Sequence, residues 1–254
     1  MIHTRICDIL GIDHPIALGG MPTLFNSPQL VSAVCGGGAL GILGCTHLSP
    51  EEIKGCAKVI RELTNRPFAL NTLMFFNDES GYAAALETRP AVISISWPKK
   101  DQDLIPWIKR AHDADCKVTV MAGEVVEAKR AADAGADIIV AQGTEGGGHV
   151  GWIATAVLIP MIVDAVSPTP VMAAGGIADG RGFAAALALG AEGILLGTRF
   201  LASEECGLHP NFKQAILDSD GHDTVLTEIP DIAANQVWPG AMSRAKRNRF
   251  VERW

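Results

Sequence analysis

Residues 140–151 combine an apolar run with a glycine-rich turn that carries one histidine, His149. An imidazole titrates near neutral pH, and glycines let a flat group approach the backbone closely. No second His or Cys stands at metal-ligand spacing, so proton transfer or the holding of an anion is favoured over metal binding. The alternative is a solvent-exposed loop histidine. The pattern therefore predicts a pocket with His149 as its reactive group and with no metal.

Two further glycine turns follow apolar runs late in the chain. One is Ala173–Gly180, with Gly175 and Gly176 in the middle, and the other is Leu196–Phe200, which contains Gly197 and Thr198. Paired glycines let backbone N–H groups converge on an anion. The alternative is that they only make tight turns. We expect them to bind a phosphate.

Two carboxamides also stand where predicted strands end. Asn71 follows Phe68-Ala69-Leu70, and Gln142 follows Asp137–Ala141. A carboxamide donates and accepts hydrogen bonds, which suits the edge of a heterocycle with alternating C=O and N–H groups. Either residue alone is more often a turn-capping side chain.

Short β-rich runs alternate with segments of helical periodicity along the whole chain, a pattern typical of βαβ units and a parallel sheet. Ser49-Pro50-Glu51-Glu52 predicts a capping box at a helix start, and Gly135 and Gly190 each predict a helix end just before a strand. The predicted strands are Pro15–Leu18, Ala39–Leu43, Phe68–Leu73, Ala91–Ser96, Lys117–Met121, Asp137–Ala141, Pro170–Ala173 and Gly193–Leu196.

Eight βα units in 254 residues favour an α/β fold of the (β/α)8 TIM-barrel class over an open doubly wound sheet. The first strand ends in Gly19-Gly20-Met21-Pro22 and lacks the dinucleotide-binding glycine pattern. No Pro/Ser-rich or charged linker interrupts the chain. We therefore expect a single domain over residues 1–254, with a tail from about residue 220 to 254 packed on the barrel.

The composition restricts the kinds of molecule that this protein is expected to bind and the compartment in which it is expected to lie. A formal net charge of −7 disfavours nucleic acid and anionic membranes, and the basic residues between Arg244 and Arg253 alternate with Phe250, as in a packed terminal segment. The six cysteines show neither zinc spacing nor a disulfide pattern, which is typical of a reducing compartment. The first residues lack a signal-peptide apolar region, and the longest apolar stretch, Ile153–Val163, is too short to span a membrane. A soluble cytoplasmic protein is expected.

Taken together, these motifs resemble the FMN-dependent nitronate monooxygenases, with the flavin-dependent enoyl-acyl-carrier-protein reductases as close relatives. The likeness covers nearly the whole chain. The most specific segments are Gln142–His149 and Ala173–Gly180, supported by Pro15–Met21, Gly38–Ile42, Phe68–Asn71 and Gly197–Phe200.

The resemblance implies a TIM barrel that binds FMN and oxidises alkyl nitronates or nitroalkanes with O2 to a carbonyl compound and nitrite. His149 matches the family's catalytic histidine and would remove a proton or hold the anion. The residues implied in binding the FMN phosphate are Gly175, Gly176, Gly197 and Thr198, and those implied in contacting its ring are Gly20, Met21, Asn71, Gln142 and Gly147.

The sequence departs from the family pattern in two places. Two other functions also stay open. Some relatives carry a lysine at the end of the fifth strand, where this chain has Val118–Met121, and the segments after the third and eighth strands look short. One alternative is an NAD(P)H-dependent reductase of enoyl thioesters or quinones; the other is a flavin- or phosphate-binding carrier without turnover. The apolar helix expected at Ile153–Val166 is compatible with a homodimer.

Overall fold

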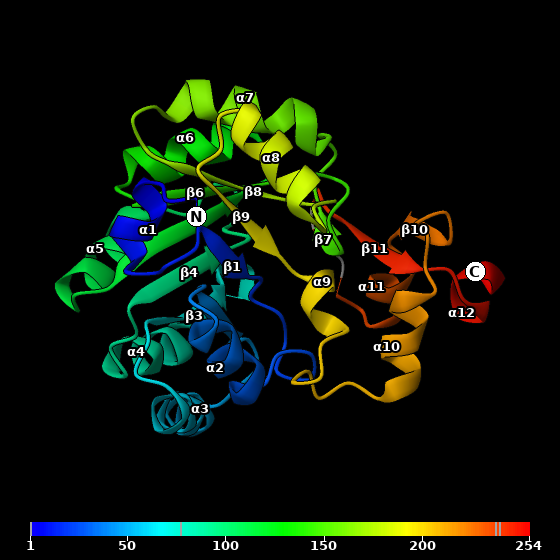
Figure 1. Cartoon of the computed structure of the whole chain (residues 1–254), viewed down its shortest axis with the longest axis horizontal. Helices are drawn as coiled ribbons and strands as arrows, with labels where there is room; N and C mark the ends of the chain where they lie inside the picture. The colour runs from blue at the N-terminus through cyan, green and yellow to red at the C-terminus, as the bar shows by residue number, and fades with distance from the viewer. Residues whose placement is uncertain (1, 77, 237, 239) are drawn as a thin grey trace.

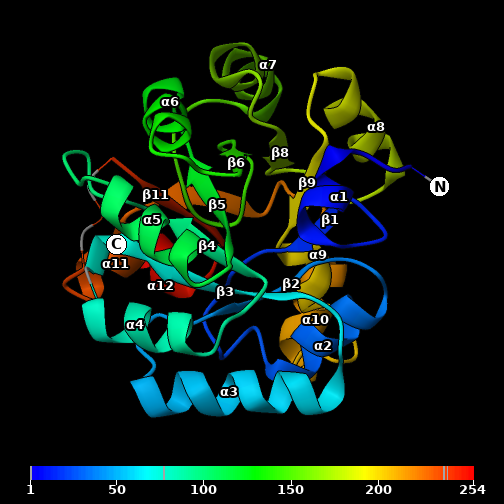
Figure 2. The same cartoon turned by 90° about the vertical axis from the view of Figure 1, so that its left-hand side faces the viewer.

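The computed structural model describes residues 2–76, 78–236, 238 and 240–254. Within them, eight parallel strands form one sheet in the order β1-β9-β8-β6-β5-β4-β3-β2. The edge strands meet through a parallel bridge between Ala17 and Leu40, so the sheet is nearly closed into a barrel (Figures 1 and 2). The strands are β1 (Ile16–Leu18), β2 (Gly41–Gly44), β3 (Phe68–Leu73), β4 (Val92–Ser96), β5 (Lys117–Ala122), β6 (Ile138–Gln142), β8 (Val171–Ala174) and β9 (Gly193–Leu196). The (β/α)8 prediction is confirmed, and each of these strands overlaps a predicted one.

Helices surround the outside of the sheet (Figure 2). They are α2 (Pro28–Gly36), α3 (Pro50–Leu63), α4 (Glu79–Glu87), α5 (Ile105–Asp113), α6 (Val125–Asp133), α7 (Thr155–Val166) and α8 (Gly180–Ala188). The predicted capping box is present: Ser49 Oγ accepts from the Glu52 N–H and Glu52 Oε2 accepts from the Ser49 N–H. Gly135 and Gly190 have φ of 97° and 95° at the helix-to-strand joints, a region that glycine enters without steric cost.

Successive strand residues face opposite sides of the sheet, and the core follows that alternation. Leu43, Leu70 and Ile93 pack in the layer between sheet and helices. Their neighbours Ile42 and Ala69 belong to a second buried cluster inside the barrel. Helix α1 (Arg5–Leu10) contributes Ile6, Cys7 and Leu10 to that inner cluster, so it closes the amino-terminal end of the barrel. The opposite end, where the strands terminate, is left for the functional loops.

The C-terminal segment folds beside the barrel (Figure 1). Its elements are α9 (Thr198–Leu201), α10 (Pro210–Leu217), β10 (Thr224–Thr227), α11 (Ile229–Ala233), β11 (Met242–Lys246) and α12 (Arg249–Arg253), and a 3₁₀ turn, η1 (Met74–Phe76), follows β3. Strand β11 pairs with β10 and also with β7 (Gly148–Val150), which carries His149. The sequence predicts a turn over this stretch. It is a strand in the structure because it forms an antiparallel ladder with β11, nearly a hundred residues later.

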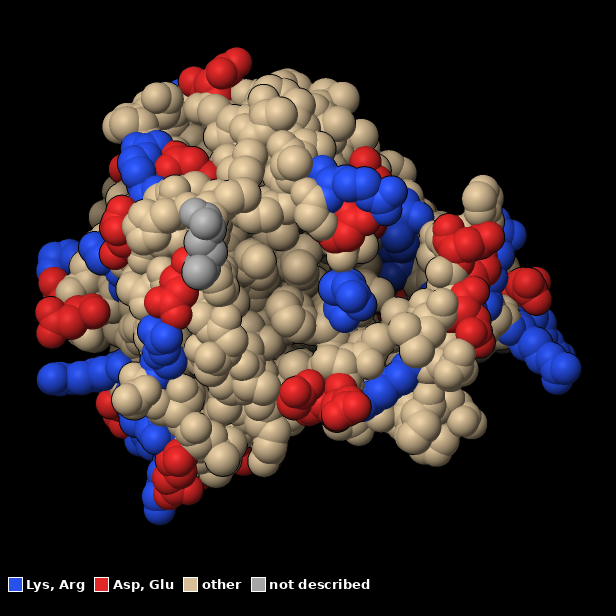
Figure 3. Space-filling view, viewed as in Figure 1, with Lys and Arg blue, Asp and Glu red and all other residues tan. Residues whose placement is uncertain are grey.

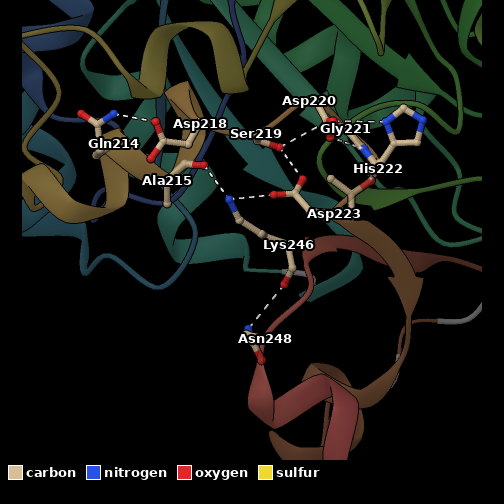
Figure 4. A network of polar contacts seen from close by, with 11 residues as sticks. Gln214, Ala215, Asp218, Ser219, Asp220, Gly221, His222, Asp223, Lys246 and Asn248 are labelled. Carbon is tan, nitrogen blue, oxygen red and sulfur yellow. Dashed lines mark hydrogen bonds and ion pairs between the residues drawn. The ribbon is translucent and has the colours of Figure 1, made fainter.

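A network of polar contacts anchors the end of β11 (Figure 4). The Lys246 ammonium donates to the carbonyl of Ala215 and contacts the Asp223 carboxylate, and Ser219 Oγ donates to Asp223 as well. Hydrogen bonds from Lys246 and Ser219 lower the pKa of Asp223. Beyond this anchor, Phe250 is 45% exposed and Trp254 is 83% exposed. The packing of the tail on the barrel stays a prediction.

The described residues also bear on the expectations about charge, membranes, metals and a homodimer. Lys and Arg side chains are interspersed with Asp and Glu over one face of the molecule (Figure 3). Among the described residues, no helix is both long and apolar enough to cross a bilayer, and no group of three or more metal-ligating side chains occurs. Helix α7 leaves Val157 and Met161 exposed, with Trp152 exposed just before it. The homodimer stays a prediction.

Candidate active site

His149 lies on β7 and is enclosed by the C-terminal segment. Its backbone is in register with Ser243 of β11. Its Nε2 lies 3.0 Å from Oδ1 of Asp231 on α11, and its ring stacks on Trp238 with centroids 3.9 Å apart and an interplanar angle of 18°. A histidine held by a carboxylate on its edge and an indole on its face has one orientation. The exposed-loop alternative for His149 is therefore wrong.

Aromatic side chains from two strand exits surround Trp238. Phe75 stacks on Trp238 with centroids 5.3 Å apart, and Phe76 meets the indole edge-on at 5.7 Å. Trp97, directly after β4, contacts Trp238 at 5.7 Å from a backbone with φ of 52°, a strained region for a bulky residue. These rings form an apolar wall beside His149.

The four rings of this wall and the carboxylate behind it were not predicted from the sequence. The place of Phe75, Phe76 and Trp97 just after predicted strands was a usable signal, because reactive pockets in this fold form at strand exits. Asp231 and Trp238 carried no local signal. They reach His149 only through the pairing of β11 with β7.

The glycine turn before β7 is fixed to the start of α7. Ala154, the residue that precedes α7, provides no side-chain cap. Glu145 Oε2 instead accepts from the Thr155 backbone N–H at 2.8 Å and from Thr155 Oγ1 at 2.7 Å, which places a negative charge at a helix N-terminus. Partial burial would raise the pKa of Glu145, but the hydrogen bonds from Thr155 outweigh it and the pKa is lowered. Glu145 thus braces the turn and not the imidazole.

We expect Glu145→Gln to lower stability by about 1 kcal/mol, or a Tm decrease of about 2–4 °C, because a neutral amide is a weaker acceptor at this helix start. Since the folded-state pKa of Glu145 lies below its unfolded value, the carboxylate contributes fully above the unfolded pKa. That contribution is lost as the pH falls through the folded pKa, so the Tm gap between wild type and variant should close in acid. Thermal melts across pH check this.

Glu124→Gln is the matched control, because Glu124 precedes α6 but makes no side-chain cap hydrogen bond. It should melt like the wild type at every pH. A Glu145 variant whose Tm deficit stays constant into acid would contradict the assigned role.

The loops after β6, β8 and β9 converge. A methyl group added at Gly147 would lie 2.9 Å from Thr198 Oγ1, and one added at Gly176 would lie 3.0 Å from Glu145 Cβ. Gly175 and Gly176 have φ of 106° and 69°, so the turn after β8 depends on glycine at both positions. The residues expected to bind a phosphate therefore lie next to the turn that leads to His149.

The N-terminus of α8 is occupied by its own cap. Asp179 Oδ1 accepts from the backbone N–H groups of Arg181 and Gly182, and the hydrogen bond from the Arg181 side chain is the main cause that lowers the pKa of Asp179 to about 2. An anion is disfavoured beside that carboxylate. Any phosphate at this end of the barrel would be met by the Gly175–Gly176 and Gly197–Thr198 backbones.

The remaining predicted residues line the other side of the barrel mouth. A methyl group on Gly20 would lie 2.5 Å from Asn71 Cβ, and one on Gly197 would lie 3.7 Å from Met21 Sδ, so Met21 links the two sides. Asn71 is buried, and its Nδ2 donates to Ser96 Oγ at 2.9 Å and to the Ser94 carbonyl at 3.1 Å. The carboxamide oxygen of Asn71 accepts no hydrogen bond from the described residues, so it is the atom of this side chain that a ligand could contact. Gln142, at the end of β6, has its Nε2 3.4 Å from the methyl position on Gly146.

A family comparison decides the class of protein. The family model for nitronate monooxygenase matches residues 3–87 and 82–253. The chain belongs to the nitronate monooxygenase family. As a member of that family it is an oxidoreductase.

Several similar proteins carry names that point to different activities. FabK from Thermotoga maritima is 34% identical with a TM-score of 0.90, over 100% of this chain and 77% of that one. The nitroalkane oxidase from Streptomyces ansochromogenes is 29% identical with a TM-score of 0.82, over 98% and 80%. A Mycobacterium tuberculosis protein named (3aS,4S,5R,7aS)-5-hydroxy-7a-methyl-1-oxo-octahydro-1H-indene-4-carboxyl-CoA dehydrogenase is 34% identical over 99% of this chain and 68% of its own. This nitronate monooxygenase family member is thus shorter than all three.

Proposed function

We propose that this enzyme is an FMN-dependent nitronate monooxygenase that oxidises alkyl nitronates and nitroalkanes with O2 to a carbonyl compound and nitrite. The observation that supports it best is His149, a partly buried imidazole beside a glycine-lined barrel mouth and an aromatic wall. The similarity to a nitroalkane oxidase points the same way.

The residues at the barrel mouth fit a flavin mononucleotide. Gly175, Gly176 and Gly197 leave backbone free of side chains where a phosphate would lie, and Thr198 adds an exposed hydroxyl. Gly20, Met21, Asn71, Gln142 and Gly147 surround the space proposed for the ring. The bound flavin would supply the redox chemistry, accepting electrons from the substrate and passing them to O2.

His149 would act at the substrate carbon. For a neutral nitroalkane, the imidazole removes the α-proton and leaves the electron pair delocalised on the nitro group. For a preformed nitronate no proton transfer is required, and the imidazolium form of His149 would donate to the anion and hold it. The aromatic wall covers one face of the imidazole and would limit the access of water during this proton transfer.

Anaerobic stopped-flow mixing tests the proposal. Ethyl nitronate should bleach the flavin absorbance of the holoenzyme without any nicotinamide nucleotide, and admitted O2 should restore it with release of nitrite. Rapid bleaching by NADH together with inertness toward ethyl nitronate would instead identify a reductase.

The reductase of enoyl thioesters or quinones is the second candidate, because a relative named as a carboxyl-CoA dehydrogenase is 34% identical to this chain. It would bind flavin at the same backbone positions, Gly175–Gly176 and Gly197–Thr198 (the glycine cradle), with NAD(P)H as the electron donor. Turnover of crotonyl-CoA with NADH, at a rate above that for ethyl nitronate, would support it. A chain that retains flavin but turns over none of these compounds would be a carrier.

A further inference from the structure

The contact between His149 and Asp231 is the most shielded of the four His–Asp contacts among the described residues. Its side chains are 23% and 10% exposed, against 59% and 72% for His3 with Asp8. The other two, His112–Asp137 and His222–Asp220, also have more exposed histidines. Water screens exposed pairs, so the pair at the barrel mouth is the one whose geometry can control chemistry.

Asp231 itself is buried at a cost. The residue is 7% exposed, and its Oδ2 is buried without a hydrogen-bond partner among the described residues. A buried carboxylate with one oxygen unpaired lowers the stability of the fold, and such a group in a native structure calls for an explanation, such as a catalytic role. Backbone hydrogen bonds from the Asp231 N–H to the Glu228 carbonyl and from the Gln236 N–H to the Asp231 carbonyl fix it on both sides. The backbone of Asp231 is therefore held in place independently of His149.

An ionised carboxylate only accepts hydrogen bonds, so the nitrogen of His149 that faces Asp231 must carry the proton. That nitrogen is Nε2. Among the described residues, Nδ1 makes no hydrogen bond. For the neutral imidazole, the hydrogen-bond network thus assigns the tautomer with hydrogen on Nε2 and a lone pair on Nδ1.

We propose that Asp231 is the positioning residue of this active site: it fixes the tautomer and plane of His149 so that Nδ1 takes the substrate's α-proton. The inference rests on the proposed role of His149 as the base. In the step, the substrate C–H bond breaks, its proton forms an N–H bond at Nδ1, and the electron pair stays on the substrate, delocalised onto the nitro group. The resulting imidazolium keeps its Nε2–H on Asp231, which stabilises the positive charge.

The first test reads the tautomer and needs no turnover. Long-range 1H–15N correlation spectra of the ¹⁵N-labelled full chain should show His149, assigned by comparison with His149→Asn, as the Nε2–H tautomer. In Asp231→Asn the amide can donate to Nε2 as well as accept from it, so this preference should be lost. Glu228→Gln, an exposed change on the residue before α11, should leave the spectrum unchanged. A wild-type His149 protonated on Nδ1 alone would overturn the proposal.

The second test separates proton transfer from packing. Asp231→Asn should lower kcat for nitroethane by about 10²–10³-fold, because a misoriented base loses most of its contribution. Oxidation of ethyl nitronate, which needs no base, should stay within about threefold of wild type. Asp231→Glu, which keeps the carboxylate, should recover part of the nitroethane activity. Equal losses on both substrates with flavin retained, or no loss on either, would overturn the role of Asp231.

The two tests also separate this inference from the proposed function. If the wild type oxidises neither nitroethane nor ethyl nitronate, the proposed reaction fails, while the tautomer spectra still decide whether Asp231 orients His149. If Asp231→Asn does not fold, the wild-type spectrum and the Asp231→Glu kinetics carry the test.

Discussion

Replacing His149 with asparagine should reduce kcat for nitroethane by about 10²–10⁴-fold, the usual contribution of a positioned general base. The asparagine amide ends near the position of imidazole Nδ1 and does not reach Asp231, which His149 contacts through Nε2. The buried carboxylate then loses its partner, so Tm and flavin content are measured beside activity. Ethyl nitronate should remain a substrate, weakened only by the loss of a group that holds the anion. Oxygen uptake and nitrite release with the two substrates measure the difference.

His222 provides the matched control. Its side chain is 93% exposed in the turn before β10 and contacts Asp220, which is itself 75% exposed. His222→Asn should fold normally and keep its activity on both substrates, because an exposed ion pair contributes little to stability. Wild-type nitroethane oxidation by the His149 variant would remove the base from the mechanism.

Replacing Gly175 with alanine should abolish stoichiometric flavin retention and lower stability by about 2–4 kcal/mol. Its φ of 106° is disfavoured for any L side chain, and the added methyl would lie 2.9 Å from the Gly143 carbonyl oxygen and from Thr155 Oγ1. Relief requires the β8 exit to move away from the turn that leads to His149. Absorbance of the purified protein and thermal melting report both effects.

Gly180→Ala is the control for that change, five residues further along the same loop. A methyl group there meets no atom within 4 Å, and Gly180 is the first residue of α8. Alanine should be neutral or raise Tm slightly, with flavin retained. A Gly175 variant that binds flavin as tightly as this control would contradict the proposed phosphate site.

The barrel could be predicted from the sequence because its signals are local. Each strand is an apolar run bounded by its own turn residues, and the joints at Gly135 and Gly190 repeat one local geometry. The glycine turns at 143–148 and 175–176 were predictable for the same reason. Their convergence, with Thr198 Oγ1 next to Gly147, follows from closing the barrel.

The surroundings of His149 could not be predicted in that way. Asp231 lies 82 residues further along the chain, and β7, the strand that carries His149 and pairs with the C-terminal segment, is only three residues long. Neither Asp231 nor Trp238 stands in a periodic pattern or a motif. They lie beside His149 because β11 pairs with β7, and a pairing between distant segments cannot be predicted from the residues near either one.

The order of the two halves of the site along the chain has a consequence for biogenesis. The glycine cradle is complete once Thr198 has been translated, whereas the carboxylate and indole that hold the imidazole emerge from the ribosome tens of residues later. Domains made in this amino-to-carboxyl order gain their last contacts from the final segment. A nascent polypeptide halted before α11 would have the eight strands but an unrestrained His149, so proton abstraction would be among the last properties acquired during synthesis.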